Sequence, residues 1–427
     1  MEYILISMSL ALFVGLMMSR VAKKVHLPAV TAYLITGLLL GPFGLGRLGI
    51  NGLGFVSLEN VENLSVISNM ALGFIAFTIG NEFRVHDLRA MGKQAVTVGI
   101  VQAVFTTLVV DVVLVGLHFI NPSLITVSSA ITLGAIAAAT APAATLMVVR
   151  QYKADGPLTR LLLMVVAIDD AVGLVVFSVS FGIATALESG VISVLTVAVE
   201  PLLEIVFSIL LGTVAGFVLN WSEQYFHSRG NRMSMTVAFV MLTVGISMVE
   251  FDIGPVHCGF SLLLVCMMTG TVFCNICPTS DELMDRLDRW TTPLSILFFV
   301  LSGAELDLNI LRNPMVLMIG IVFIIARSLG KISGAYISCT ATGCSKPIRK
   351  YLGITLLPQA GVALGMAQTA AQLSDGQIVR NVVLFAVLVY ELVGPTLTKL
   401  SLTAAGEIHL DPTEDPNQMP TLSPKNS

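Results

Sequence analysis

The chain has 427 residues, of which 55% are hydrophobic and only 12% are charged. Soluble domains contain about 25% charged residues, so this composition excludes an ordinary soluble protein and predicts an all-α protein that crosses a membrane many times. Its net charge is −4, and it has no basic stripe and no separate soluble domain, which argues against nucleic-acid binding.

Thirteen apolar segments are bounded by charged or turn-forming residues and are predicted to be transmembrane helices. In chain order they span 3–19, 28–48, 62–81, 94–118, 124–149, 158–187, 196–221, 233–250, 256–276, 291–304, 314–338, 350–372 and 380–402. The segment 291–304 is short for a crossing and is expected to extend into its flanks. Residues 1–402 are therefore assigned to one transmembrane domain. The polar stretch 403–427 is rich in Pro, Asp and Thr and is predicted to be a disordered cytoplasmic tail.

The distribution of Lys and Arg between alternate loops predicts the orientation of these helices. If the N-terminus lies outside, 18 of the 23 basic residues fall in cytoplasmic loops or after the last helix, against three outside. Such a bias is the usual pattern of membrane proteins. The sequence thus predicts a multi-pass protein of a cell membrane, a bacterial inner membrane, with its N-terminus outside and its C-terminus in the cytoplasm.

The two halves of the chain share short sequence matches at nearly constant spacing. Three pairs match, with offsets of 221, 223 and 233 residues: Asp170-Ala-Val-Gly173 with Glu391-Leu-Val-Gly394, Gly80-Asn-Glu82-Phe83 with Gly303-Ala-Glu305-Leu306, and Thr36-Gly37 with Thr269-Gly270. Seven predicted helices, an odd number, separate the copies, so the second copy is predicted to be inverted in the membrane. Inverted repeats are the architecture of secondary transporters, whose binding sites lie near the bilayer midplane where broken helices meet.

Two predicted helices contain a proline at equivalent places in the two halves. In the fifth, Pro142 removes a backbone donor and disfavours helical geometry just before it, which frees carbonyl groups near Thr140. In the twelfth, Pro358 and Gln359 take the same place. The structural alternative is a pair of proline kinks that neighbouring helices tolerate. Two interrupted helices in corresponding positions instead point to a binding site.

Several charged side chains fall inside predicted membrane helices, and five of them are candidates for function: Asp169, Asp170, Arg327, Lys331 and Glu391. A charge at the centre of a membrane helix costs about 2.5–3.5 kcal/mol on insertion scales, so such residues usually serve a function. The structural alternative is an ion pair that only braces helices. Either Lys331 or Arg327 can pair with Asp169, because the two cations lie one helical turn apart. Glu391 is expected to neutralise Arg327.

Several motifs resemble those of monovalent cation:proton antiporter family 2. The motifs are Leu34-Ile-Thr-Gly37-Leu-Leu-Leu-Gly41-Pro42, Thr140-Ala-Pro142, Ile168-Asp169-Asp170, Phe298-Phe-Val-Leu-Ser302-Gly303 and Gly330-Lys331. They lie between the second and the eleventh predicted helix, and the resemblance as a whole covers the chain from the second to the thirteenth. The paired aspartates and the lysine resemble the electrogenic sodium/proton branch of that family. The resemblance implies an inverted-repeat antiporter with a dimerisation part and a mobile core, which works as a homodimer.

Carried onto this chain residue by residue, the resemblance implies roles for the candidate site. The core would comprise the fourth to sixth and the eleventh to thirteenth predicted helices, with the interrupted fifth and twelfth crossing inside it. Asp170 matches the cation-binding aspartate, here for Na⁺. Asp169 matches the aspartate that pairs with the lysine, here Lys331. Thr140 matches the threonine of the interrupted helix near the ion.

The expected activity is exchange of a monovalent cation for protons by alternating access, with Na⁺ or Li⁺ favoured and pH homeostasis as the cellular role. Hard monovalent cations prefer oxygen ligands, and a buried carboxylate without its cation takes up a proton more easily. Asp170 would therefore carry either a cation or a proton, and little would be gained from both. No constellation of nucleophile and general base predicts an enzyme, and no cofactor is expected.

Two alternatives stay open from the sequence. Relatives with paired aspartates often carry Pro-Arg-Gly-Glu where this chain has Pro358-Gln359-Ala360-Gly361, and potassium-efflux relatives carry a Gln there. A K⁺/H⁺ antiporter or a regulated K⁺ efflux protein is therefore the first alternative. A sodium-coupled solute symporter, which shares the inverted-repeat architecture, is the alternative of another class.

Overall fold

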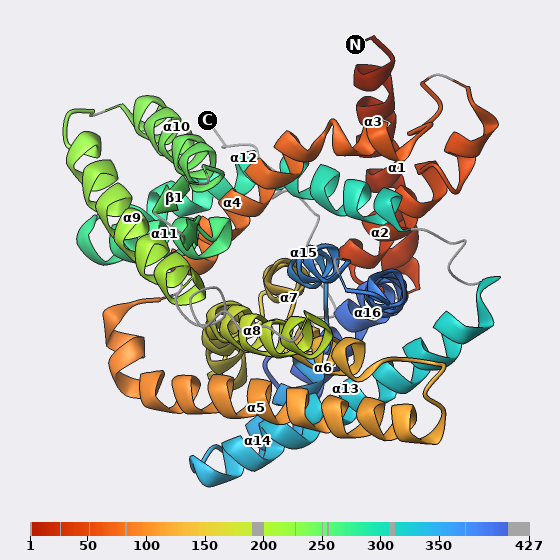
Figure 1. Cartoon of the computed structure of the whole chain (residues 1–427). Helices are drawn as coiled ribbons and strands as arrows, with labels where there is room; N and C mark the ends of the chain where they lie inside the picture. The colour runs from red at the N-terminus through yellow and green to blue at the C-terminus, as the bar shows by residue number, and fades with distance from the viewer. Residues whose placement is uncertain are drawn as a thin grey trace.

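The computed structural model describes residues 2–25, 27–50, 52–81, 83–189, 200–226, 228–249, 251–253, 256–306, 312–371 and 373–408. These residues form sixteen α-helices, one short 3-10 helix and one pair of short strands (Figure 1). In chain order the elements are α1 (Glu2–Lys24), α2 (Ala29–Leu40), η1 (Leu45–Leu48), α3 (Leu58–Glu62), α4 (Ser65–Asn81), α5 (Val85–Ile120), α6 (Val127–Ile136), α7 (Pro142–Gln151), α8 (Pro157–Ser189), α9 (Glu200–Glu223), α10 (Arg229–Ser247), β1 (Phe251–Ile253), β2 (Val256–Cys258), α11 (Leu262–Ile276), α12 (Ser280–Glu305), α13 (Pro314–Ala341), α14 (Lys346–Thr355), α15 (Gly361–Ala370) and α16 (Gly376–Ala404).

Each of the thirteen predicted membrane segments corresponds to one helix or to a pair of short helices. The short segment 291–304 extends toward the N-terminus, as predicted, because α12 begins at Ser280. The predicted helix start at residue 256 is wrong, since residues 256–258 pair with β1 and α11 begins only at Leu262. Within the described residues, seven helical stretches are long and apolar enough to cross a membrane on length and composition.

The helices pack in two groups (Figure 1). In the first group α2 packs against α1 and α12, and α11 packs against α4 and α9. In the second group α5 runs along α13, while α8 packs against α5 and α6, and α16 packs against α13, α14 and α15. We refer to α1–α4 with α9–α12 as the scaffold and to α5–α8 with α13–α16 as the core. The core so defined consists of the same segments to which the family resemblance gives that name.

Four glycines lie where the scaffold helices cross. Gly37 of α2 abuts the main chain of α12, and Gly303 of α12 abuts the main chain of α2. Gly80 of α4 and Gly270 of α11 abut the main chain of each other's helix in the same way. In the sequence repeat Gly37 corresponds to Gly270 and Gly80 to Gly303, so α2 corresponds to α11 and α4 to α12. The contact of α2 with α12 is therefore the repeat equivalent of the contact of α11 with α4. Such an exchange of contacts is what a two-fold axis between two copies produces, and it confirms the predicted inverted repeat.

The two interrupted helices cross inside the core. Residues 137–141 separate α6 from α7, and residues 356–360 separate α14 from α15. The backbone N–H of Ala141 donates a hydrogen bond of 2.8 Å to the carbonyl of Pro358, so the two non-helical stretches touch. Pro142 stands at the first turn of α7, where its missing N–H leaves no bond unmade. The predicted pair of crossing broken helices is therefore present.

The chain continues in packed structure beyond the end of α16. Glu407 is 8% exposed, and its carboxylate accepts hydrogen bonds from the backbone N–H groups of Leu158, at 2.6 Å, and Thr159, at 2.7 Å. These N–H groups belong to the first turn of α8, where backbone N–H groups find no acceptor within their own helix. Residues 403–408, which the sequence assigns to the disordered tail, thus pack against the start of α8. Residues 409–427 of that tail lie outside the described residues.

Candidate functional site

The candidate site lies at the crossing of the interrupted helices, where α8 and α13 pass on either side. Asp169 and Asp170 are consecutive residues near the middle of α8. Neighbouring residues of an α-helix point about 100° apart, so the two carboxylates meet different surroundings. Asp169 is 0% exposed and Asp170 is 7% exposed.

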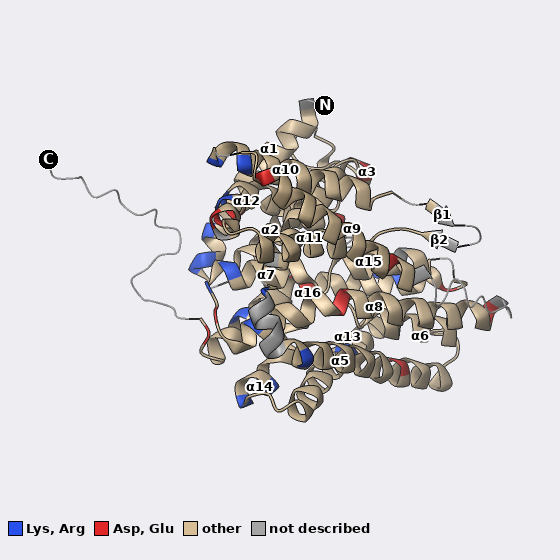
Figure 2. Cartoon of the chain, turned by 90° about the vertical axis from the view of Figure 1, so that its left-hand side faces the viewer, with Lys and Arg blue, Asp and Glu red and all other residues tan. Residues whose placement is uncertain are grey.

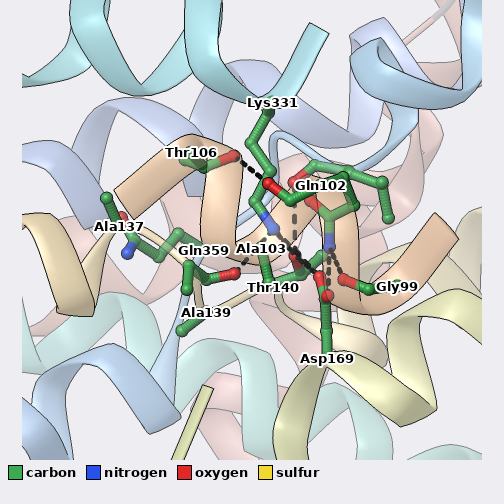
Figure 3. A network of polar contacts seen from close by, with 12 residues as sticks. Gly99, Gln102, Ala103, Thr106, Ala137, Ala139, Thr140, Asp169, Lys331 and Gln359 are labelled. Carbon is green, nitrogen blue, oxygen red and sulfur yellow. Dashed lines mark hydrogen bonds and ion pairs between the residues drawn. The ribbon is translucent and has the colours of Figure 1, made fainter. Parts of the chain in front are cut away.

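Asp169 is held by three side chains, two from other helices and one from the first helix break (Figure 3). Lys331 of α13 lies with its Nζ 2.9 Å from Asp169 Oδ2. The hydroxyl of Thr140 donates to the same oxygen at 2.6 Å. The amide of Gln102, on α5, donates to the other oxygen, Oδ1. Both oxygens of Asp169 are therefore occupied, which makes a buried ion pair with its hydrogen bonds largely satisfied.

Lys331 uses its remaining donors on the first helix break. Its Nζ donates to the carbonyl of Ala138 at 2.6 Å and to the hydroxyl of Thr140 at 2.9 Å. The hydroxyl of Thr140 in turn donates its hydrogen bond to Asp169. The sequence leaves open whether Lys331 or Arg327 pairs with Asp169, and the contacts in the structure are those of Lys331.

Arg327, one turn earlier on α13, instead holds both breaks together. Its guanidinium donates to the carbonyls of Ala137 at 3.0 Å and Ala139 at 2.7 Å, and to that of Leu357 at 2.7 Å. Its Cζ atom lies over the Tyr390 ring, 4.5 Å from the ring centre. Cations bind favourably at helix C-termini, and α6 and α14 both end here. The expectation that Glu391 neutralises Arg327 is wrong, because no ion pair joins them among the described residues and Glu391 Oε2 has no partner there.

Asp170 differs from Asp169 in having an oxygen without a partner. Its Oδ1 is buried and accepts no hydrogen bond within the described part of the chain. Gly173, one turn further along α8, lies 4.0 Å or less from Ala139 of the first break and from Met366 of α15, measured from the position a Cβ would take. The face of α8 that carries Asp170 and Gly173 therefore lies beside both interrupted helices. Carboxylate, hydroxyl and carbonyl oxygens are the ligands that a hard monovalent cation requires.

Gln359 lies at the second break and reaches across to the first. Its amide donates to the carbonyl of Ile136, the last residue of α6, at 2.9 Å. This bond satisfies one of the carbonyls that the end of a helix leaves without a partner. Its own Oε1 is buried and unpartnered within the described residues, which leaves a second free oxygen at the crossing.

Gln102 is the residue that the sequence reasoning missed. It is 0% exposed and donates to both Asp169 and, at 3.1 Å, to the carbonyl of Gly99 on its own helix. The available signal is a single amide side chain in the middle of the apolar segment 94–118, which is costly unless it is bonded. Among the described residues there is no group of three His, Cys, Asp or Glu side chains of the kind that holds a multivalent metal ion.

Comparison with known proteins shows a match over nearly the whole chain. The family model described as sodium/hydrogen exchanger, transmembrane, matches residues 8–403. A structure of the sodium proton antiporter MjNhaP1 from Methanocaldococcus jannaschii at pH 8 is 20% identical, with a TM-score of 0.63 over 93% of this chain and 95% of that chain. An electron-microscopy structure of the same antiporter is 18% identical, with a TM-score of 0.70 over 94% of this chain and 95% of that chain. The search of curated protein sequences gave no match. At these identities the two structures establish a shared fold.

Proposed function

The chain belongs to the sodium/hydrogen exchanger family, whose activity is cation/proton antiport, and we propose that Asp170 is the carboxylate at which Na⁺ or Li⁺ competes with a proton. The observation that carries this proposal is the contrast between the two aspartates. Asp169 has both oxygens engaged by Lys331, Thr140 and Gln102, whereas Asp170 has a buried oxygen with no partner among the residues that the structure describes.

The competition follows from the surroundings of Asp170. A carboxylate that is taken out of water and has no cationic partner is unfavourable unless it binds a proton or a cation. Binding either one neutralises it, and binding both gains little. If the core moves across the scaffold only when Asp170 is neutralised, a proton gradient drives cations the other way. Alternating access of this kind is the behaviour that the inverted repeat and the paired broken helices support.

Lys331 adds a second charge to the proposed cycle. Its Nζ pairs with Asp169 Oδ2 at 2.9 Å. We propose that cation binding near Thr140 loosens this pair, and that Lys331 then releases a proton in addition to the one from Asp170. Two protons would be exchanged for one monovalent cation, which makes transport electrogenic.

For the transported ion we propose Na⁺ and Li⁺ in preference to K⁺, on the strength of the aspartate pair. Potassium is the second candidate, because the free oxygen of Gln359 is a neutral ligand and potassium-efflux relatives carry a Gln at that position. Proton movement in everted vesicles carrying a pH dye, evoked in turn by NaCl, LiCl and KCl, separates the two. A symporter would instead require an organic solute in the same assay.

The orientation and assembly are further proposals. Lys and Arg gather toward one side of the helical assembly, the left side in Figure 2, which supports a cytoplasmic face there and an N-terminus outside. We propose that the protein is a homodimer in a cell membrane, the bacterial inner membrane, as the family resemblance implies.

Asp170→Asn tests the central assignment. The amide has nearly the same shape but cannot alternate between a proton and a cation, so exchange in proteoliposomes should be lost while the purified protein stays monodisperse. Asp155→Asn is the matched control, because the Asp155 side chain is 77% exposed in a loop outside the site, and it should transport like the wild type. Exchange at the wild-type rate in Asp170→Asn would contradict the proposal.

A further inference from the structure

Glu391 is a buried carboxylate that the mechanism at Asp170 does not use. It lies in the middle of α16, is 6% exposed, and its Oε2 is buried without a hydrogen-bond partner within the described residues. A carboxylate in this position is not stable as a bare anion in a membrane, so it must hold either a proton or a cation.

The obvious structural explanation for Glu391 is an ion pair with Arg327, and the contacts exclude it. All three kinds of guanidinium nitrogen on Arg327 donate to backbone carbonyls, and its face is covered by Tyr390, the residue before Glu391. Lys331, the other buried cation of α13, donates to Asp169, Thr140 and Ala138. Within the described residues neither cation forms an ion pair or a hydrogen bond with Glu391, whose Oε2 has no partner.

Glu391 occupies the place in the second repeat that Asp170 occupies in the first. One turn after Asp170, Gly173 lies against Ala139 of the first helix break. One turn after Glu391, Gly394 lies against Pro358 of the second break, 3.0–3.1 Å from the position of a Cβ. Each repeat therefore sets one acidic side chain and one glycine of a long helix against its own broken helix.

The two carboxylates also lie at similar depth. Asp170 is 13 residues from the start of α8 at Pro157, and Glu391 is 13 residues from the end of α16 at Ala404. These two helix ends lie on the same side, since Glu407 just after α16 bonds to the first turn of α8. At 1.5 Å per residue, each carboxylate is about 20 Å from that side.

Glu305 lies beyond Glu391, toward the opposite side. Its helix, α12, is fixed near its start on the first side, where Asp288 pairs with Arg150 at 2.6 Å. Glu305 comes 17 residues later, about 25 Å further along the helix. It is exposed, and the residues beside it place this end of α12 near α16.

Two contacts place the end of α12 near α16. Gly41, the residue after α2, abuts the main chain of Ala304, and α2 also packs against α16. Leu306 belongs to the same buried cluster as Leu388 of α16. A solvent-accessible carboxylate of the scaffold thus lies at the boundary where the end of α12 approaches the core helix that carries Glu391.

We propose that Glu391 and Glu305 form a second binding site for the transported monovalent cation, on the path between Asp170 and the face on which α12 ends. The inference rests on the proposed function, because the cation that it binds is the one exchanged at Asp170. Carboxylate oxygens are suitable ligands for Na⁺ or Li⁺, and the site joins a core helix to a scaffold helix at the boundary where access to Asp170 must open. Glu305 attracts the cation from water, and Glu391 passes it to the crossing of the broken helices.

Cation-dependent thermal stability tests binding without requiring transport, because a ligand that binds only the folded protein raises its melting temperature. The probe is NaCl titrated against choline chloride at constant ionic strength, on the wild type, Asp170→Asn, Glu391→Gln and the double variant. Asp170→Asn should keep a saturable part of the rise in Tm, and the double variant should show none. The inference is overturned if Asp170→Asn shows no rise, or if the double variant keeps the rise that Asp170→Asn has.

Exchange kinetics give the second test. Glu305→Gln, an exposed position where folding is not at risk, should raise the KM for Na⁺ several-fold when Na⁺ is added on the side where α12 ends, and much less from the other side. Glu59→Gln, also exposed and on the neighbouring helix α3, is the matched control and should leave both values unchanged. Equal KM values for Glu305→Gln and the wild type from both sides overturn the inference. The proposed function fails on a different result, namely wild-type exchange in Asp170→Asn.

Discussion

Replacing Lys331 tests how many charges move in each transport cycle. Its ammonium group is 0% exposed and donates to Asp169 at 2.9 Å, to Thr140 at 2.9 Å and to the carbonyl of Ala138 at 2.6 Å. In Lys331→Gln the side chain is shorter and has no charge. Asp169 then keeps the hydrogen bonds from Thr140 and Gln102 but loses its only ion-pair partner among the described residues.

The size of the effect follows from the burial of the pair. Removing one member of a buried ion pair costs about 3–5 kcal/mol when the other member stays charged. The hydrogen bonds from Thr140 and Gln102 are present in both proteins, so they do not offset this loss. The penalty disappears if Asp169 holds a proton throughout the cycle, because the site then contains no unpaired charge. In that case Asp170 alone exchanges a proton for a cation, and transport becomes electroneutral.

The assay is Na⁺/H⁺ exchange in proteoliposomes, with valinomycin and K⁺ setting the membrane potential. If the wild type moves one net charge per cycle, about 100 mV changes the driving force by about 2.3 kcal/mol, roughly 50-fold in the Na⁺ gradient that balances the proton gradient. Lys331→Gln should show a slower rate and no such shift. Lys350→Gln is the control, since Lys350 is an exposed residue of α14 with its Nζ over the Tyr351 ring, and it should respond like the wild type.

Two results would refute the reasoning about Lys331. One is a wild-type exchange that does not respond to the imposed potential, which would rule out the two-proton cycle even with Asp170 essential. The other is a Lys331→Gln variant with the full wild-type shift, which would mean that Lys331 carries no proton of the cycle and that the pair with Asp169 only stiffens the core.

Three further substitutions test single contacts. Gln102→Leu removes a donor to a buried carboxylate and should lower the free energy of unfolding by about 1.5–3 kcal/mol. Thermal unfolding in detergent measures this loss, and an unchanged Tm would show that the contact with Asp169 contributes nothing to stability. Arg327→Leu leaves the carbonyls of both helix breaks without a donor and should lower the free energy of unfolding by about 3 kcal/mol or more. Most of the variant should then aggregate on a sizing column. A monodisperse, active variant would contradict the role assigned to Arg327. Glu407→Ala removes the cap of α8 and should cost about 0.5–2 kcal/mol, with faster hydrogen exchange confined to the first turn of that helix, whereas uniform exchange would argue against a local cap.

The sequence signals that predicted the fold are local ones. Each membrane crossing must be a long apolar stretch, so the segments could be counted. Pro142 and Pro358 interrupt their helices wherever those helices lie, because the lost donor and the restricted residue before it are properties of the proline itself. The glycines of the repeat, such as Gly37 and Gly303, could be matched by spacing, and the structure shows that they are places where two backbones touch.

The partners of the buried charges could not be predicted in the same way. Arg327 and Lys331 lie one turn apart on one face of α13, so the sequence gives both cations the same access to Asp169. Whether Arg327 or Lys331 binds Asp169 depends on which of them bonds to the backbone carbonyls of the first helix break, almost 190 residues away in the chain. The same reason explains why Gln102 was missed and why the pairing of Glu391 was predicted wrongly, since an amide or a carboxylate carries no mark of the segment it will meet.

In the proposed cycle, the order of the two cations along α13 determines which aspartate is left for the ion. Arg327 reaches the carbonyls of Ala137, Ala139 and Leu357, at the ends of both α6 and α14, where the helix dipoles already supply partial negative charge. It therefore needs no carboxylate, and a carboxylate would displace it from those carbonyls. Lys331 needs only one donor for the carbonyl of Ala138, and its other two hold Thr140 and Asp169. Both buried cations therefore bind other groups, and Asp170 keeps an oxygen without a partner in the described part of the chain. We propose that this oxygen is neutralised by what enters from solution, a proton or a cation.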